Sequence, residues 1–198
     1  MQQILKTANN IKKYVDSGKD YPFPEHINAY CPFCKCITQF SKHGFYLRYF
    51  ISQIYVGLIY IRRYICYCKK LTISLLPSFC IFRKTIAFEN IFGYTHAAYF
   101  RNSTLRKTLE DLNRSNPSID MSRQLLYFYR KRWRNNLNLI ESGIRQIKPD
   151  TILPNRNFDI NRRAKALLDA VKEEFGPLEY FTNAFFEKTN KSPFALIK

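Results

Sequence analysis

All six cysteines of this 198-residue chain lie in one quarter of it, between Cys31 and Cys80. The stretch opens with Cys31-Pro32-Phe33-Cys34 and carries a second pair in Cys66-Tyr67-Cys68. A Cys-Pro-X-Cys turn places two thiolates on one side of a tight bend, and two such turns together form the tetrahedral sulfur cage that Zn²⁺ prefers. We therefore expect a zinc site whose ligands are Cys31, Cys34, Cys66 and Cys68.

The second cysteine pair is one residue shorter than the usual Cys-X-X-Cys, so its backbone must change locally for both sulfurs to reach one metal. Cys36, Cys80 and His43 are substitute ligands within the same stretch. The alternative is a set of reduced cysteines that pack as small hydrophobic side chains. Disulfides are disfavoured, because residues 1–19 contain four lysines and no apolar secretory core.

Segments 37–40, 44–50 and 54–64, which lie between the two pairs, are rich in β-branched and aromatic residues. Such composition predicts short strands, and with the two cysteine turns it predicts a small zinc-ribbon β domain. Cationic neighbours lower thiol pKa values and offset the charge of a four-thiolate zinc centre. Five basic residues lie beside the pairs: Lys35, Arg62, Arg63, Lys69 and Lys70.

The residues around the cysteines also resemble those of a known protein family. Arg62-Arg63-Tyr64-Ile65-Cys66, the later Thr72-Ile73-Ser74-Leu75-Leu76-Pro77, the Cys-Pro-X-Cys turn and His43-Gly44-Phe45-Tyr46 resemble the zinc-ribbon start of bacterial insertion-sequence transposases. The likeness covers the chain from Tyr21 to Trp133. It implies a following helix-turn-helix region, double-stranded DNA as the partner, and a homodimer or a separate transposase subunit as the protein partner.

The chain has 32 Lys and Arg against 15 Asp and Glu, a net charge of +17. Such an excess favours an acidic polymer, most commonly nucleic acid, and a cytoplasmic, nucleoid-associated protein. Residues 1–80 carry 11 basic and 3 acidic groups, residues 81–150 carry 13 and 6, and residues 151–198 carry 8 and 6. The first two segments are therefore the expected nucleic-acid contacts. The uncharged run Tyr49–Ile61 is too short for a membrane span, which needs about 20 residues.

Apolar periodicity predicts a short N-terminal helix over Gln2–Val15 and helices between Arg83 and Asn113. Residues 113–120 then break the pattern and form a long turn for a helix-turn-helix. One apolar stripe continues from Met121 to Lys148 and predicts a single long helix, softened at Gly143. Residues 161–175 and 178–188 predict a C-terminal helical hairpin, after which Phe194–Lys198 forms a tail.

The predicted long helix has a basic flank at its N-terminal half, where a recognition helix contacts bases. Its guanidinium groups suit phosphates or guanine, and Gln124 suits adenine. The alternative is a solvated face on a structural helix. The flank comprises Arg123, Gln124, Tyr127, Arg130, Lys131 and Arg134.

No catalytic arrangement is evident in the sequence, because Asp150, Asp159, Asp169 and Glu173 follow no alternating strand-and-helix pattern. The expected protein is α+β and not an enzyme. It comprises an N-terminal helix (1–20), a zinc ribbon (21–82), a helical DNA-binding region (83–150) and a helical hairpin (151–198). A zinc-stabilised protein-interaction module and an RNA-binding protein, with Tyr46 and Tyr49 stacking on bases, are the alternatives.

Overall fold

The computed structural model describes residues 2–5, 7, 10–81, 84–101, 103–176 and 178–195. The chain divides into two compact units, Met1–Thr85 and Ile86–Lys198. The first unit holds the described strands and the second is helical, so the predicted α+β class is confirmed. The predicted segments 1–20 and 21–82 fall in the first unit, and 83–150 and 151–198 fall in the second apart from residues 83–85.

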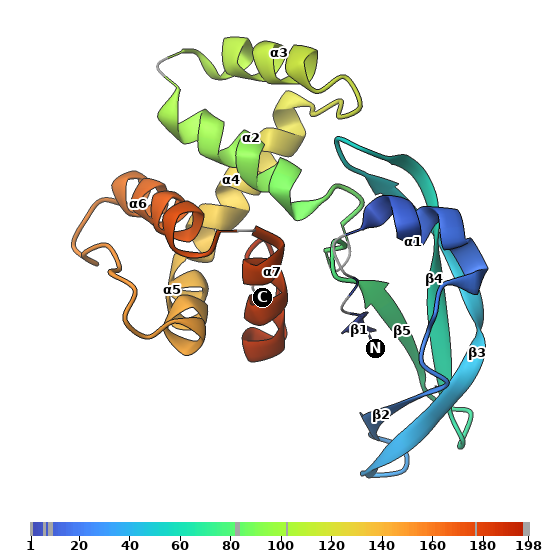
Figure 1. Cartoon of the computed structure of the whole chain (residues 1–198). Coiled ribbons are helices and arrows are strands. Elements are labelled where there is room, and N and C mark those ends of the chain that lie inside the picture. Colours follow the sequence, from blue (N-terminus) through green and yellow to red (C-terminus); the bar gives the residue numbers. More distant parts are fainter. Residues whose placement is uncertain are drawn as a thin grey trace. The chain divides into compact units, whose positions relative to one another are not determined.

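The first unit is built on a five-stranded sheet in the order β1-β5-β4-β3-β2 (Figure 1). Strands β2 to β5 form an antiparallel meander, and β1 pairs with β5 in parallel. In such a meander the β2–β3 and β4–β5 turns lie at the same end of the sheet. The strands are β1 (Gln2–Leu5), β2 (His26–Cys31), β3 (Cys36–Ile51), β4 (Val56–Cys66) and β5 (Thr72–Pro77).

The two strands predicted at 37–40 and 44–50 are a single strand, β3, with a bulge between Lys42 and Gly44. Gly44 has φ 131°, a backbone conformation that glycine adopts without a steric penalty. The bulge lets one long strand bend while it keeps its pairing with β4. His43 lies in this bulge with an exposed side chain.

The predicted N-terminal helix is wrong in its first half. Gln2–Leu5 forms β1, and α1 covers only Ile11–Ser17, followed by a short 3-10 turn, η1 (Gly18–Asp20). Ala8, part of the predicted helix, lies outside the described residues. Pairing with β5, 72 residues further on, supplies backbone hydrogen bonds that the local sequence does not reveal. Within the same unit, Tyr14 of α1 is buried and its hydroxyl donates to the carbonyl of Tyr60 at 2.6 Å.

The second unit contains α2 (Phe88–Phe100), α3 (Leu105–Ser115), α4 (Arg123–Asn135), α5 (Leu137–Ile147), α6 (Ile160–Glu174) and α7 (Leu178–Thr189). Trp133 lies at its centre, fully buried, with its indole Nε1 donating to the carbonyl of Ala164 at 3.0 Å. Phe194, in the predicted tail, is also buried and lies 5.5 Å from the Trp133 ring; residues 196–198 lie outside the described chain.

The single long helix predicted over Met121–Lys148 is wrong, because α4 and α5 are separate helices. The break lies at Asn136, not at the predicted Gly143. Asn136 is buried, and its side-chain amide donates to the carbonyls of Pro193 at 2.7 Å and Ala195 at 2.9 Å. These contacts with a distant part of the chain hold Asn136 at φ −103° and ψ 9°, where the helix cannot continue.

The connection between α3 and α4 comprises seven residues, 116–122, which is longer than the three or four of a helix-turn-helix. Asn113 fixes it through two hydrogen bonds with the backbone of Met121, at 3.1 and 3.3 Å. Ile119 and Met121 are buried, so this connection is a packed part of the helical unit.

Candidate metal centre

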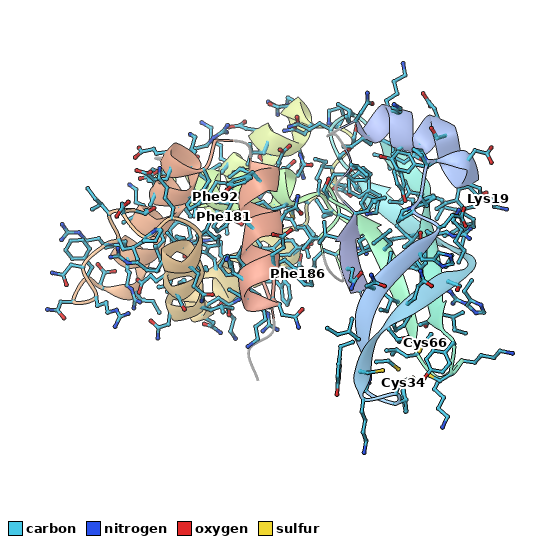
Figure 2. The ribbon with its side chains drawn as sticks, turned by 60° about the horizontal axis from the view of Figure 1, so that its bottom comes forward. Lys19, Cys34, Cys66, Phe92, Phe181 and Phe186 are labelled. Carbon is cyan, nitrogen blue, oxygen red and sulfur yellow. The ribbon has the colours of Figure 1, made fainter. Side chains whose placement is uncertain are left out.

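Two turns at one end of the sheet supply the candidate ligands. Residues 32–35 connect Cys31 of β2 to its register partner Cys36 of β3. Residues 67–70 connect Cys66 of β4 to Leu71, whose carbonyl accepts from the Cys66 amide at 3.0 Å. Figure 2 shows Cys34 and Cys66 together at this end, away from Lys19.

Both turns contain a lysine with a left-handed backbone, directly after the second cysteine. The φ angle is 55° at Lys35 and 57° at Lys69. A residue with a Cβ adopts this region at a cost of about 1 kcal/mol, so each turn carries a local strain. Both turns comprise four residues, 32–35 and 67–70, although their cysteine spacings differ.

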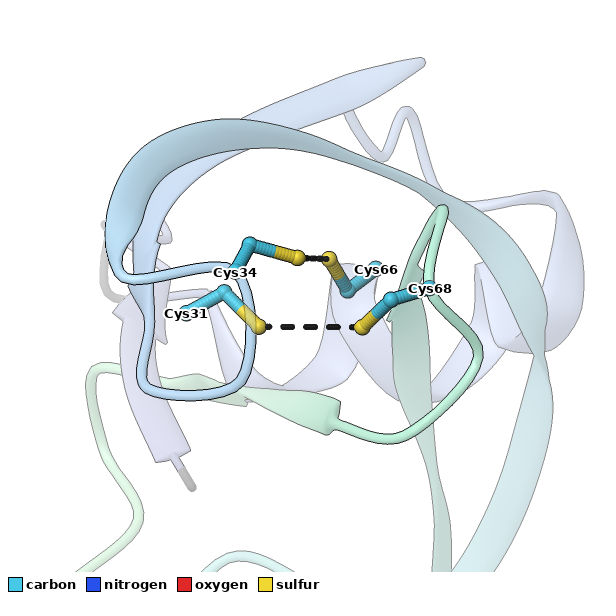
Figure 3. Close-up of side chains that lie close together, drawn as sticks. All are labelled: Cys31, Cys34, Cys66 and Cys68. Carbon is cyan, nitrogen blue, oxygen red and sulfur yellow. Dashed lines mark hydrogen bonds between the residues drawn. The ribbon is translucent and has the colours of Figure 1, made fainter.

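The four predicted sulfur ligands lie together (Figure 3). The sulfur atoms of Cys31 and Cys68 are 3.8 Å apart and those of Cys34 and Cys66 are 3.5 Å apart. All four sulfurs lie within 4.8 Å of one another. A tetrahedral zinc with bonds of about 2.3 Å requires sulfur separations of about 3.8 Å, so the donor set and its spacing fit this metal.

The substitute ligands do not belong to this group. Within the described part of the chain, the potential metal-binding group consists of Cys31, Cys34, Cys66 and Cys68 alone. Cys36 is exposed at the start of β3, whereas Cys80 is buried after β5. Burial raises the pKa of Tyr14, and the nearby Cys80 adds to this shift. None of the six cysteines forms a disulfide bond.

The local environment distinguishes the thiols from one another. Burial raises the pKa of Cys31, but amide groups of Cys34 and Phe33 and neighbouring thiols oppose it and bring the value to about 7. Burial, with the adjacent thiols, raises the pKa of Cys34 to about 12, and burial also raises the pKa of Cys66. Cys34 and Cys66 therefore favour the neutral thiol, and a cation bound by all four sulfurs would have to replace these protons.

Sequence reasoning missed the role of Tyr67 in this cluster. The nearby thiol of Cys34, in the other turn, raises the pKa of Tyr67 to about 12. The ring itself remains 71% exposed. Its position between two cysteines of a pair was the available signal, because side chains there must lie close to any bound metal.

The two arginines predicted beside the cysteine pairs are only partly exposed. Arg62 and Arg63 are half-buried on β4, and the Arg62 guanidinium lies 4.5 Å from the centre of the Phe45 ring. The Nε atoms of both are buried without a hydrogen-bond partner among the described residues. The three lysines of the turns, Lys35, Lys69 and Lys70, are exposed.

The structure divides the predicted basic flank of α4 into two groups. Arg130 and Arg134 are half-buried: the Arg130 guanidinium lies 4.7 Å from the centre of the Tyr99 ring, and Arg134 donates to Asn161 at 3.4 Å. These two arginines therefore stabilise helix packing. The exposed group comprises Arg123, Gln124, Tyr127 and Lys131.

The exposed group borders a hollow in the helical unit. Arg123, Gln124 and Tyr127 line it from α4, and Leu105 and Arg106 line it from α3. Arg106 also forms an ion pair with Glu110, at 2.8 Å. The hollow is thus lined by the apolar Leu105 together with cationic and hydrogen-bonding side chains on two neighbouring helices.

Two of the four carboxylates considered as catalytic groups, Asp159 and Asp169, have other contacts. Asp159 caps α6 by accepting from the amides of Asn161 and Arg162, at 2.9 and 3.1 Å. Asp169 lies 3.2 Å from Nε2 of His96, which stacks on Phe100 with ring centres 4.2 Å apart. The histidine comes from α2 and the aspartate from α6, so no local spacing indicated this pair.

Comparison of the chain with protein-family models, curated proteins and solved structures finds no match. The search for membrane-crossing helices, made over the described residues, finds none of sufficient length and apolar character.

Proposed function

We propose that this chain is a zinc-dependent DNA-binding protein, similar to the DNA-recognition part of an insertion-sequence transposase. The observation that carries the DNA-binding part is the exposed group on α4, Arg123, Gln124, Tyr127 and Lys131. Arginine and lysine neutralise phosphates, and arginine and glutamine also match the edges of guanine and adenine. The zinc part rests on the group of four thiols.

The net charge of +17 supports the same partner. Long-range attraction to a polyanion accelerates association, and contacts with phosphates supply sequence-independent affinity. Arg123, Gln124 and Tyr127 of this group lie in the N-terminal half of α4, and the helix dipole at the first turn also favours a phosphate. On this proposal the protein is associated with the nucleoid and acts without a nuclease of its own.

Salt dependence of duplex DNA binding tests the proposal. Fluorescence anisotropy with a labelled duplex should give a log–log slope of about −0.9 for each phosphate contacted. Replacing Arg123 and Lys131 by alanine together should reduce the slope by about 2 and weaken binding at low salt. A parent protein that does not bind duplex DNA at low salt would favour the protein-interaction module instead.

A matched variant controls for the loss of charge. Lys172 of α6 and Lys188 of α7 are exposed, and their double replacement by alanine removes the same charge from other helices. This control should keep the parent's slope and affinity. Equal losses in both double variants would show that net charge, rather than the exposed group on α4, determines binding.

A further inference from the structure

The stretch from His26 to Phe88 contains no Asp or Glu, although it has nine Lys and Arg residues. It includes both cysteine turns and strands β2 to β5. Carboxylates are common on ordinary protein surfaces, where they balance basic side chains. The two cysteine turns and strands β2 to β5 therefore carry basic side chains and no carboxylate side chain that would repel a polyanion.

Three aromatic rings are exposed at this same end: Tyr30 by 54%, Phe33 by 58% and Tyr67 by 71%. Other rings of the unit, such as Phe40 and Tyr64, are fully buried in its core. Phe33 lies between the two cysteines of the first turn, and Tyr67 lies between those of the second. A large apolar ring that is left in water at such a rigid position suits a ligand with a flat face.

The cysteine cluster fixes the position of the two rings. Tyr67 lies between Cys66 and Cys68, and Phe33 is the residue directly before Cys34. The sulfur atoms of Cys34 and Cys66 lie 3.5 Å apart, so the two turns that carry Phe33 and Tyr67 lie side by side. The exposed lysines Lys35 and Lys69 follow the second cysteine of each turn.

We propose that the two cysteine turns form a binding site for unpaired bases of single-stranded nucleic acid, with Phe33 and Tyr67 as stacking platforms and Lys35, Lys69 and Lys70 as phosphate contacts. Base faces are accessible only when the strand is unpaired, and aromatic stacking recognises every base. This proposal depends on the zinc ion of the proposed function, because that ion would hold the two turns together. The site is separate from the exposed group on α4 that is proposed to bind duplex DNA.

The charges at the site predict a modest salt dependence. Four thiolates with one Zn²⁺ carry a double negative charge, which the three lysines of the turns offset and slightly exceed. Single strands give a slope of about −0.7 for each contact, so three lysines supply a slope no steeper than about −2. Stacking therefore contributes most of the affinity, in contrast to the duplex binding proposed for α4.

The test uses the zinc-loaded full chain and a single-stranded oligonucleotide of about ten bases, within the usual site size for one small domain. Phe33→Ala and Tyr67→Ala should each lower affinity about tenfold. Tyr67→Phe keeps the ring and should stay within about twofold of the parent. Parallel measurements with deoxyribose and ribose oligonucleotides of one sequence identify which strand binds tighter, and ring removal should weaken that complex.

The backbone of the turns offers a further control. Because Lys35 and Lys69 have positive φ angles, Lys35→Gly and Lys69→Gly remove a cation without straining the turn. Each should make the salt slope shallower by about 0.7. The zinc content of every variant is measured in parallel. If Tyr67→Ala loses zinc, the test of stacking depends on Phe33→Ala, because the proposal assigns the Phe33 ring no part in holding the metal.

The proposed functions fail separately. The Arg123 and Lys131 double variant should bind the single strand like the parent, and the ring variants should bind duplex DNA like the parent. The proposed stacking site is wrong if Phe33→Ala binds the single strand as tightly as the parent does. It is also wrong if Phe33→Ala loses single-strand affinity and duplex affinity to the same extent. Ring-dependent binding to vesicles of phosphatidylcholine and phosphatidylserine, without single-strand binding, would also overturn it and identify a membrane surface instead.

Discussion

The sulfur atoms of Cys34 and Cys66 lie 3.5 Å apart, although 32 residues separate them in sequence. This relationship joins the β2–β3 turn to the β4–β5 turn at one end of the sheet. Metal-binding free energy at such a site is also folding free energy, because the unfolded chain holds no preformed set of ligands. The stability of the first unit should therefore depend on these two cysteines.

Cys66→Ser should destabilise the zinc-loaded protein by several kcal/mol, on the order expected for loss of a structural zinc ligand. Cys36→Ser is the matched control, because Cys36 is exposed and lies outside the group of four; its effect should stay within about 0.5 kcal/mol. Chemical unfolding followed by circular dichroism measures both. Equal destabilisation by the two variants would contradict the assignment of ligands.

Two glycines in helices should respond to alanine in opposite directions. A Cβ at Gly143 of α5 would lie 2.2 Å from the Phe185 ring of α7, so Gly143→Ala should cost about 1 to 3 kcal/mol through overpacking. Gly93 of α2 is exposed, a Cβ there would meet no described atom within 4 Å, and Gly93→Ala should stabilise the helix by about 0.5 to 1 kcal/mol. Thermal unfolding of both variants checks the packing of α5 on α7.

His96 should make stability depend on pH. Burial lowers its pKa, although Asp169 opposes this effect, and Lys172 and Lys165 add to the lowering. The unfolded state then binds a proton more readily than the folded state, so stability should fall as pH decreases through the unfolded value of about 6.5. His96→Phe removes this contribution while it keeps an aromatic ring.

The measurement is the free energy of unfolding at several pH values on both sides of that value. The free energy of unfolding should decrease less towards acid pH in His96→Phe than in the parent. Both proteins contain the same cysteines, so the effect of cysteine protonation cancels when the two free energies are subtracted. A greater acid loss in the variant would indicate that the Asp169 contact dominates and that the folded protein favours the protonated ring.

The cysteine group was accessible from sequence because each turn places its ligands within two or three residues. The break at Asn136 was not, because Trp133, Leu137 and Ile140 keep one helical period across it while the contacts that fix it come from residues 193 and 195. Strand β1 was missed for the same reason, since its partner β5 is remote in the sequence. Local patterns thus predicted the elements, whereas distant pairings determined their limits.

The packing of the α4 arginines follows the same principle. Helical spacing placed Arg123, Arg130 and Arg134 on one flank, but it could not show that Tyr99 of α2 covers Arg130 or that Asn161 of α6 contacts Arg134. Part of a basic flank can therefore serve packing while the rest of it faces solvent. This division determines which side chains are suitable for testing DNA contact.

The central claim is that Cys31, Cys34, Cys66 and Cys68 hold one zinc ion, and elemental analysis of protein purified without chelator tests it most directly. We expect one zinc per chain in the parent and in Cys36→Ser, and a marked loss of zinc in Cys31→Ser and Cys66→Ser. A parent protein without bound zinc, one that holds iron instead, or undiminished zinc in both ligand variants would contradict the claim.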